Sequence, residues 1–266
     1  GVPMAKDLEF FGNHEAARLF GESVERLKRL GGMPVEIDLA PFLETARLLY
    51  CGPWVAERYQ AIRDFFDAHA DVVFPPVREI IAGGRLQSAA DAFAGQYRLK
   101  ALKRRCDMAW HDIDVLLTPT AGTIYTVAAM ETSTIRLNAN LGWYTNFMNL
   151  LDLSATAVPA GFQANGLPFG VTLVAPPHQD GPLLHLASRF LQALGGKLGA
   201  TPHELPPADS LSLLPSGQVR VAVVGAHLSG LPLNHQLAER NGRLVAAIRT
   251  APKYRFHALP DGKRPG

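Results

Sequence analysis

A helical segment that leads directly into a short extended segment is the feature that most constrains this fold. Across residues 13–30, apolar residues recur at the three- and four-residue spacing of one helix face. Asn13 can cap the start of this helix, and the glycine pair at 31–32 can end it. Across residues 35–38, apolar and acidic residues alternate, which is typical of a half-buried strand. This succession predicts the layered packing of an α/β fold.

Helices and strands continue to be expected through residue 194. The expected helices cover residues 41–50, 53–69, 77–82, 88–110, 138–151 and 182–194, and the expected short strands cover residues 114–119, 155–158 and 170–174. Pro53 should begin a new helix, because proline fits a first turn and disrupts a helix interior. The Thr-rich residues 118–134 are expected to be irregular and to lie near a functional rim.

The chain changes character after residue 200. Residues 201–217 are rich in Pro, Ser and Leu, which predicts a linker between domains. Beyond it we expect strands at residues 219–224, 243–250 and 254–259, with one short helix at 233–240. The predicted domains are therefore residues 1–200, a linker at 201–217 and a small β-rich unit at 218–266. Neither end of the chain has a closing element, so we expect a portion of a longer protein.

Composition narrows the functional classes. With 47% hydrophobic residues the chain can bury a substantial core, and its net charge of +2 demands neither a nucleic acid nor a membrane as partner. No apolar run is long enough for a transmembrane helix, and the first residues do not form a signal peptide. Cys51 and Cys106 belong to no C-x-x-C pair, so we expect no disulfide and a cytoplasmic location.

Several signatures of hydrolytic chemistry are absent from the sequence. There is no G-x-S-x-G elbow, no S-x-x-K and no H-E-x-x-H. Ser23 and Arg26 have the spacing of the second motif, but arginine stays protonated and cannot shuttle protons. His111, Asp112 and Asp114 are interpreted as a polar helix end that leads into a strand, and we predict no metal there.

Two further signals favour structural interpretations. Residues 221–230 imitate the strand and turn of a dinucleotide fold, but His227 occupies the position where a glycine must admit the pyrophosphate. We therefore predict no cofactor. The basic residues of the segment 98–105 are more typical of a solvated helix face than of a phosphate site.

Tyr50 and Arg58 flank the expected helix break at Gly52 and Pro53. They are eight positions apart, which is about two helical turns, so a modest kink can direct both side chains to one cavity. A guanidinium binds a carboxylate in bidentate fashion, and a tyrosine hydroxyl can add a hydrogen bond. The alternative is a surface ion pair beside a packed tyrosine.

Three segments, in order and sensibly spaced, resemble the amidase signature family. Residues 114–120 read DVLLTPT, residues 149–162 read NLLDLSATAVPAGF, and residues 166–176 read GLPFGVTLVAP. Within that family, residues 8–12, residues 50–59 and residues 221–237 are similar to the allophanate hydrolase subgroup, whose members carry an additional C-terminal domain. The resemblance covers essentially the whole chain.

The resemblance implies a fold, a substrate and a site. It implies the C-terminal part of a mixed-sheet α/β fold flanked by helices, followed by a truncated small α+β domain. It also implies hydrolysis of a linear amide bond, with allophanate (urea-1-carboxylate) as the favoured substrate. Arg58 would bind the substrate carboxylate and Tyr50 would hydrogen-bond the substrate, and together they would orient the amide for attack.

The sequence departs from the family pattern in one respect. Amidase signature enzymes use a Ser–Ser–Lys triad in a Gly/Ser-rich region, and no such region occurs among these residues. We therefore name no catalytic residue and predict that the chain alone is inactive. Two alternatives remain open: a non-catalytic binding module, and part of a tRNA-dependent amidotransferase. A sheet that lacks partner strands exposes edges and apolar faces, which favours a homodimer.

Overall fold

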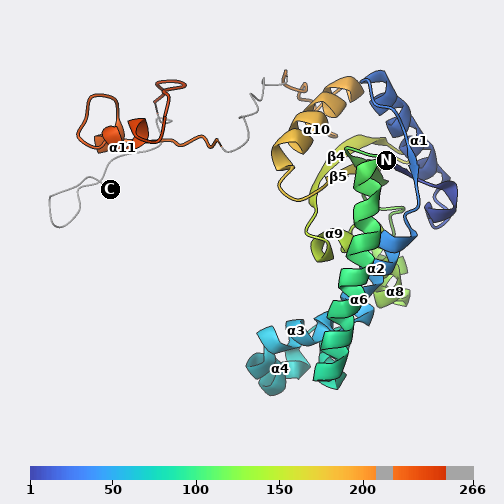
Figure 1. Cartoon of the computed structure of the whole chain (residues 1–266). Helices are drawn as coiled ribbons and strands as arrows, with labels where there is room; N and C mark the ends of the chain where they lie inside the picture. Colours follow the sequence, from blue (N-terminus) through green and yellow to red (C-terminus); the bar gives the residue numbers. More distant parts are fainter. Residues whose placement is uncertain (208–217, 250–266) are drawn as a thin grey trace. The chain divides into compact units, whose positions relative to one another are not determined.

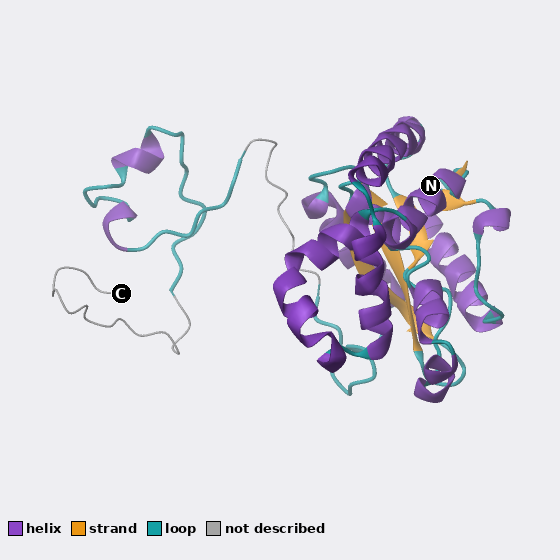
Figure 2. Cartoon of the chain, turned by 90° about the horizontal axis from the view of Figure 1, so that it is seen from below, coloured by secondary structure: helices purple, strands orange, loops and turns teal. Residues whose placement is uncertain are grey.

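The computed structural model describes residues 1–207 and 218–249. The chain divides into two compact units, Gly1–Leu213 and Leu214–Gly266, and each is described here by itself. The first unit contains a small sheet with helices packed against both faces, as Figure 2 shows with strands in orange and helices in purple. It has the predicted α/β class.

The sheet is built from segments far apart in the sequence. β4 (Ser154–Phe162) and β5 (Pro168–Ala175) form an antiparallel hairpin, and β3 (Leu116–Pro119) pairs antiparallel with the other edge of β5. β1 (Val2–Pro3) pairs parallel with β2 (Glu36–Ile37). The backbone N–H of Leu117 donates to the carbonyl of Gly1 at 2.9 Å, so β1 lies beside β3 and both parallel and antiparallel pairing occur.

One face of the sheet is covered by α1 (His14–Arg29) and α10 (Asp180–Leu194). Their buried residues, among them Phe20 and Phe190, form one core cluster with Val171 and Leu173 of β5. Asn13 caps α1 as predicted, because its side chain accepts a hydrogen bond from the N–H of Ala16 at 3.0 Å. Gly195 and Gly196, directly after α10, have positive φ values of 70° and 86°, which ends that helix.

The opposite face is covered by α2 (Ala40–Cys51), α6 (Ala89–Asp107) and α9 (Asn146–Leu150). Phe42, Cys106 and Phe147 of these helices share a second core cluster with Leu116 and Val174 of the sheet. Alternate residues of β3 and β5 therefore point to different clusters, as the pleat of a strand requires. α6 begins in a capping box formed by the side chains of Ser88 and Asp91.

A helical lobe adjoins the N-terminal end of α6 (Figure 1). Its elements are α3 (Trp54–Ala61), α4 (Arg63–His69), the 3-10 turn η2 (Ala70–Val72), α5 (Pro75–Gly83) and the 3-10 turn η3 (Gly84–Leu86). The break at Gly52 and Pro53 is confirmed. The single helix expected to run from there to residue 69 is wrong, because α3 ends and α4 begins around Ile62.

Connections elsewhere also differ from expectation. The helix expected at residues 138–151 is instead two helices, α8 (Thr134–Leu141) and α9, separated by a turn. The helix expected at residues 88–110 is α6 followed by the 3-10 turn η4 (Met108–His111). Residues 127–132, expected to be irregular, form the short helix α7 (Val127–Thr132). A further 3-10 turn, η1 (Ala5–Asp7), follows β1.

In its described residues, 218–249, the second unit contains η5 (Gly225–His227) and α11 (His235–Ala238). The strands expected at residues 219–224 and 243–250 are not formed in their described residues, which are 219–224 and 243–249. Val219 is 81% exposed and Ile248 is 84% exposed, so neither segment has the apolar layer that a strand packs on. The strand expected at residues 254–259 lies outside the described residues, as does most of the expected linker.

Candidate functional site

The helix break at residues 52–53 brings Tyr50 and Arg58 into contact. The Cζ atom of Arg58, on α3, lies 4.7 Å from the ring centroid of Tyr50, near the end of α2. This is the geometry of a cation–π contact, in which the guanidinium is attracted to the negative face of the ring. The two side chains are therefore close, as the spacing argument expected, while their sharing of a cavity and their role in binding substrate stay predictions.

The guanidinium of Arg58 and the hydroxyl of Tyr50 can both form further hydrogen bonds. Across the described part of the chain, neither the guanidinium of Arg58 nor the hydroxyl of Tyr50 has a hydrogen-bond or ion-pair partner. Tyr50 is 41% exposed, and Arg58 is half-buried. The surface ion pair that was the alternative interpretation is not formed among these residues. Such a pair can accept a carboxylate, because the edge of a stacked guanidinium keeps its N–H donors free.

Glycines hold the break in place. A Cβ atom on Gly52 would lie 2.6 Å from the carbonyl oxygen of Leu48, so a larger residue would disturb the end of α2. A Cβ atom on Gly95 of α6 would lie 2.5 Å from Cγ of Pro53, so α6 packs directly against the proline ring. These two close approaches fix the angle between α2 and α3, and with it the meeting of Tyr50 and Arg58.

Two pockets lie elsewhere, at opposite ends of the β4–β5 hairpin. One of about 330 Å³ is lined by Thr120, Thr123, Gln163 and Phe169, together with neighbouring residues. The loop at residues 120–124 thus contributes to a pocket rim, while the functional role expected for the Thr-rich segment stays a prediction. The other, of about 990 Å³, includes Asp152 and His178 in its lining.

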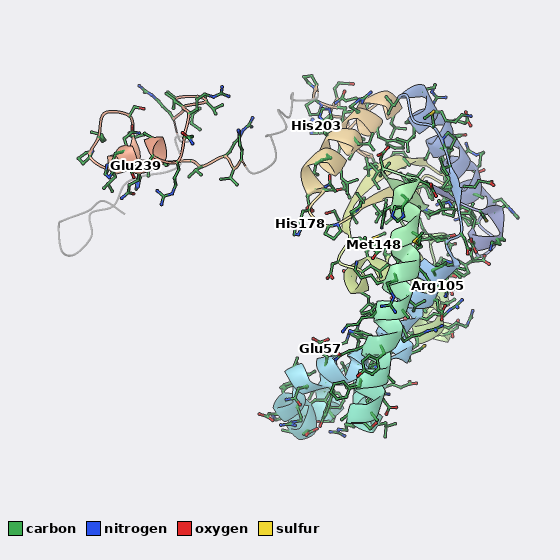
Figure 3. All side chains as sticks on the ribbon, in the orientation of Figure 1. Glu57, Arg105, Met148, His178, His203 and Glu239 are labelled. Atoms are coloured by element: carbon green, nitrogen blue, oxygen red, sulfur yellow. The ribbon has the colours of Figure 1, made fainter. Side chains whose placement is uncertain are left out.

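Tyr50 and Arg58 line neither of these pockets. Glu57, which directly precedes Arg58, lies in the helical lobe and is well separated from His178 in the view of Figure 3. The pocket residues come from several separate segments of the first unit, and many of them lie within the segments 114–120, 149–162 and 166–176 that resemble the amidase signature family. The resemblance was therefore a signal for this region, although the sequence analysis named no site residue there.

The other sequence signals have structural explanations. Ser23 and Arg26 are 0% and 7% exposed, the hydroxyl of Ser23 donates to the carbonyl of Leu19 at 2.7 Å, and Arg26 lies over the ring of Phe190. Both are packed parts of α1, and Arg26 also donates to the carbonyl of Ala160 at 3.3 Å.

The basic segment of α6 is used in helix packing. Arg98 and Arg105 both pair with Glu44 of α2, and Lys103 donates to the carbonyl of Leu151 at 3.1 Å. The described residues hold no group of three His, Cys, Asp or Glu side chains suited to a metal ion. None of the described helices has both the length and the apolar character needed to cross a membrane.

The two cysteines differ strongly in environment, which gives a direct test of the fold. Cys51 is exposed, whereas Cys106 is buried and its burial raises the pKa of the thiol to about 11. Because the thiolate is the reactive form, we expect a thiol reagent to modify one cysteine in the folded chain and two after denaturation. Cys51→Ser should abolish the native reaction. Equal rates for both thiols under native conditions would contradict the packing of α6.

Comparison with known proteins defines the class. Residues 2–184 match the model of the Amidase family, and the chain therefore belongs to that family. Residues 219–266 match the Allophanate hydrolase C-terminal domain. The predicted relationship to allophanate hydrolases is confirmed.

Individual relatives support the same relationship. The chain is 37% identical over 270 residues to urea amidolyase of Saccharomyces cerevisiae, covering 97% of this chain and 15% of that protein. It resembles the solved structure of Kluyveromyces lactis allophanate hydrolase with a TM-score of 0.76 at 36% identity, covering 90% of this chain and 40% of that one. A glutamyl-tRNA(Gln) amidotransferase component from Pseudomonas savastanoi is 31% identical over 66% of this chain and 41% of its own length. The chain thus spans well under half of each of these relatives.

Proposed function

We propose that this chain supplies the carboxylate-binding part of the substrate site in an enzyme that hydrolyses allophanate to ammonia and carbon dioxide. Such an activity would serve the breakdown of urea or s-triazine nitrogen, in the cytoplasm. The proposal is supported by the similarity of the chain to a urea amidolyase and to an allophanate hydrolase. It is also supported by the match of residues 219–266 to the C-terminal domain of allophanate hydrolase. The amidotransferase relative matches only part of the chain, which favours allophanate over a tRNA-linked substrate.

The observation that carries the proposal is the open Arg58–Tyr50 pair. Allophanate has a carboxylate at one end and a primary amide at the other. The guanidinium of Arg58, 4.7 Å from the Tyr50 ring centroid, can bind that carboxylate through two parallel hydrogen bonds. The hydroxyl of Tyr50 can add a third contact. Holding the anionic end in this way presents the amide carbonyl in one orientation and lowers the entropic part of the barrier.

Hydrolysis also requires a nucleophile, a proton acceptor and donors for the developing oxyanion. In the amidase signature family the nucleophile and its base come from the Ser–Ser–Lys region, which the sequence resemblance does not locate in these residues. We propose that this chain binds and orients, and that the triad is supplied by residues outside this sequence.

The chain alone should therefore release no ammonia from allophanate above the uncatalysed rate. Ammonia formation would be followed with the purified 266-residue chain at micromolar concentration, beside an active allophanate hydrolase as positive control. Multiple turnovers by the isolated chain, lost again in an Arg58→Ala variant, would show that a complete catalytic site is present here. That result would overturn the proposed division between binding and chemistry.

A further inference from the structure

The helix that carries Arg58 is weakly held by its own sequence. α3 has eight residues, no side-chain cap, and only one buried residue, Val55, all within the described part of the chain. Helices this short are marginal without tertiary contacts. One buried side chain leaves the rotation of α3 about its axis poorly fixed, so other contacts must determine where Arg58 points.

One group of such contacts is made by Tyr59, at the next position of α3. Consecutive helical residues project about 100° apart, so Tyr59 faces a different neighbour from Arg58. The Tyr59 hydroxyl donates to the carboxylate of Asp67 in α4, at 2.9 and 3.0 Å from its two oxygens. The Tyr59 ring also meets the ring of Phe66 edge-on, with centroids 6.0 Å apart.

Arg85 of η3 contacts Tyr59, Asp67 and Phe66 at once. Its guanidinium pairs with Asp67, and its Cζ atom lies 5.3 Å from the centroid of Tyr59 and 5.2 Å from that of Phe66. The guanidinium of Arg85 also lowers the pKa of the Asp67 carboxyl, which keeps that group ionised. One side chain therefore links α3, α4 and η3 through an ion pair and two ring contacts.

Close backbone packing places η3 directly against α3. A Cβ atom on Gly84 would lie 2.5 Å from the carbonyl oxygen of Val55, so only glycine permits this approach of η3 to α3. Arg85 follows directly and reaches Tyr59 from there. The backbone contact sets how near η3 lies to α3, and the Arg85 side chain adds a contact with Tyr59 of α3.

We infer that Arg85 is a positioning residue for substrate binding: through Tyr59 and Asp67 it holds α3 so that Arg58 presents its guanidinium to the substrate carboxylate. This inference rests on the proposed function. An exposed ion pair by itself stabilises a protein little. The role of Arg85 depends instead on its planar guanidinium, which contacts two rings and a carboxylate together.

The test uses an active polypeptide that carries this chain together with the triad, and compares Arg85→Met and Arg85→Lys with the unchanged enzyme. Arg85→Met should raise KM for allophanate by roughly tenfold, because small misplacements of a binding group weaken the oriented complex, while kcat changes much less. Arg85→Lys keeps the charge near Asp67 but loses the planar ring contacts, so its KM should be intermediate. A neutral amide such as biuret, which lacks the carboxylate, should show the same KM with all three proteins.

The matched control is Arg18→Met on α1. Arg18 is as exposed as Arg85, with side-chain values of 48% and 45%, and it also forms ion pairs, but with Glu15 and Glu22. Its KM for allophanate should not change. If Arg85→Met leaves that KM unchanged, or raises KM for biuret equally, the positioning role is wrong. If Arg58→Ala also has no effect on allophanate, the proposed function itself fails, so the two failures can be told apart.

Discussion

Arg58→Ala should lower kcat/KM for allophanate by about 100-fold in an active polypeptide that contains this chain. A hydrogen bond to a charged group contributes about 1.5–3 kcal/mol, and 1.4 kcal/mol corresponds to a tenfold change. Loss of a bidentate contact therefore predicts about 3 kcal/mol. The Arg58 guanidinium has no other partner among the described residues, so its removal leaves no acidic group of this chain unpaired. Ammonia release at substrate concentrations below KM measures the effect.

Three companion variants make this result specific. Arg58→Lys keeps the charge but cannot form the paired hydrogen bonds, so it should recover only part of the activity. Tyr50→Phe keeps the ring under the guanidinium and removes the hydroxyl, and its loss should be roughly tenfold. Biuret has no carboxylate, so Arg58→Ala should leave its turnover unchanged. An equal loss with both substrates would indicate damage to the fold, and no loss with allophanate would remove Arg58 from the site.

The meeting of Tyr50 and Arg58 could be predicted because its causes are local. Pro53 cannot continue a helix interior, and eight positions across such a break leave two side chains within reach of each other. The cap of α1 was predicted for a similar reason, since Asn13 binds a backbone group only three residues away.

The break at Ile62 could not be predicted, because its cause is a contact between helices. In a continuous helix, Tyr59 and Phe66 would be seven residues and about 10.5 Å of rise apart. Turning the chain at Ile62 lets their rings meet at 6.0 Å and lets Tyr59 bind Asp67. No residue near position 62 is a proline or glycine, so helical periodicity continued through it.

The turn between α8 and α9 has a similar origin. It places Tyr144, which is 0% exposed, so that its hydroxyl donates to the carbonyl of Glu9 at 2.8 Å and accepts from the N–H of the same residue at 2.5 Å. These partners are 135 positions apart. Gly142 was the available local signal, because glycine commonly ends a helix and it directly follows α8. The apolar spacing around it nevertheless favoured one helix.

The contacts of Arg85 with Tyr59 and Asp67 could not be predicted from sequence patterns, for a related reason. Tyr59, Asp67 and Arg85 occupy three separate elements, and no spacing relates them. Local rules predicted the break that brings Tyr50 and Arg58 together. They did not predict the contacts of α3 with α4 and η3, because tertiary packing determines those contacts.

Phe42→Ala should be among the most destabilising single substitutions in the first unit. Phe42 is 1% exposed, and its ring lies 5.3 Å from that of Phe147 and 6.5 Å from that of Trp110. Replacing a buried phenylalanine by alanine costs about 3–5 kcal/mol, through lost transfer free energy and the cavity that remains. A domain is stable by about 5–15 kcal/mol in total, so this one change removes a large share.

This loss of stability should also disturb the contact between Tyr50 and Arg58, since Phe42 anchors α2, whose other end carries Tyr50. Urea unfolding followed by circular dichroism should show a much lower midpoint with an unchanged slope. Phe65→Ala is the matched control: this phenylalanine is 52% exposed on α4, so its loss should change the free energy of unfolding by about 0.5 kcal/mol or less. Equal midpoints for the two variants would show that α2 is not packed on α9 as described, and the support for the Tyr50–Arg58 geometry would fall with it.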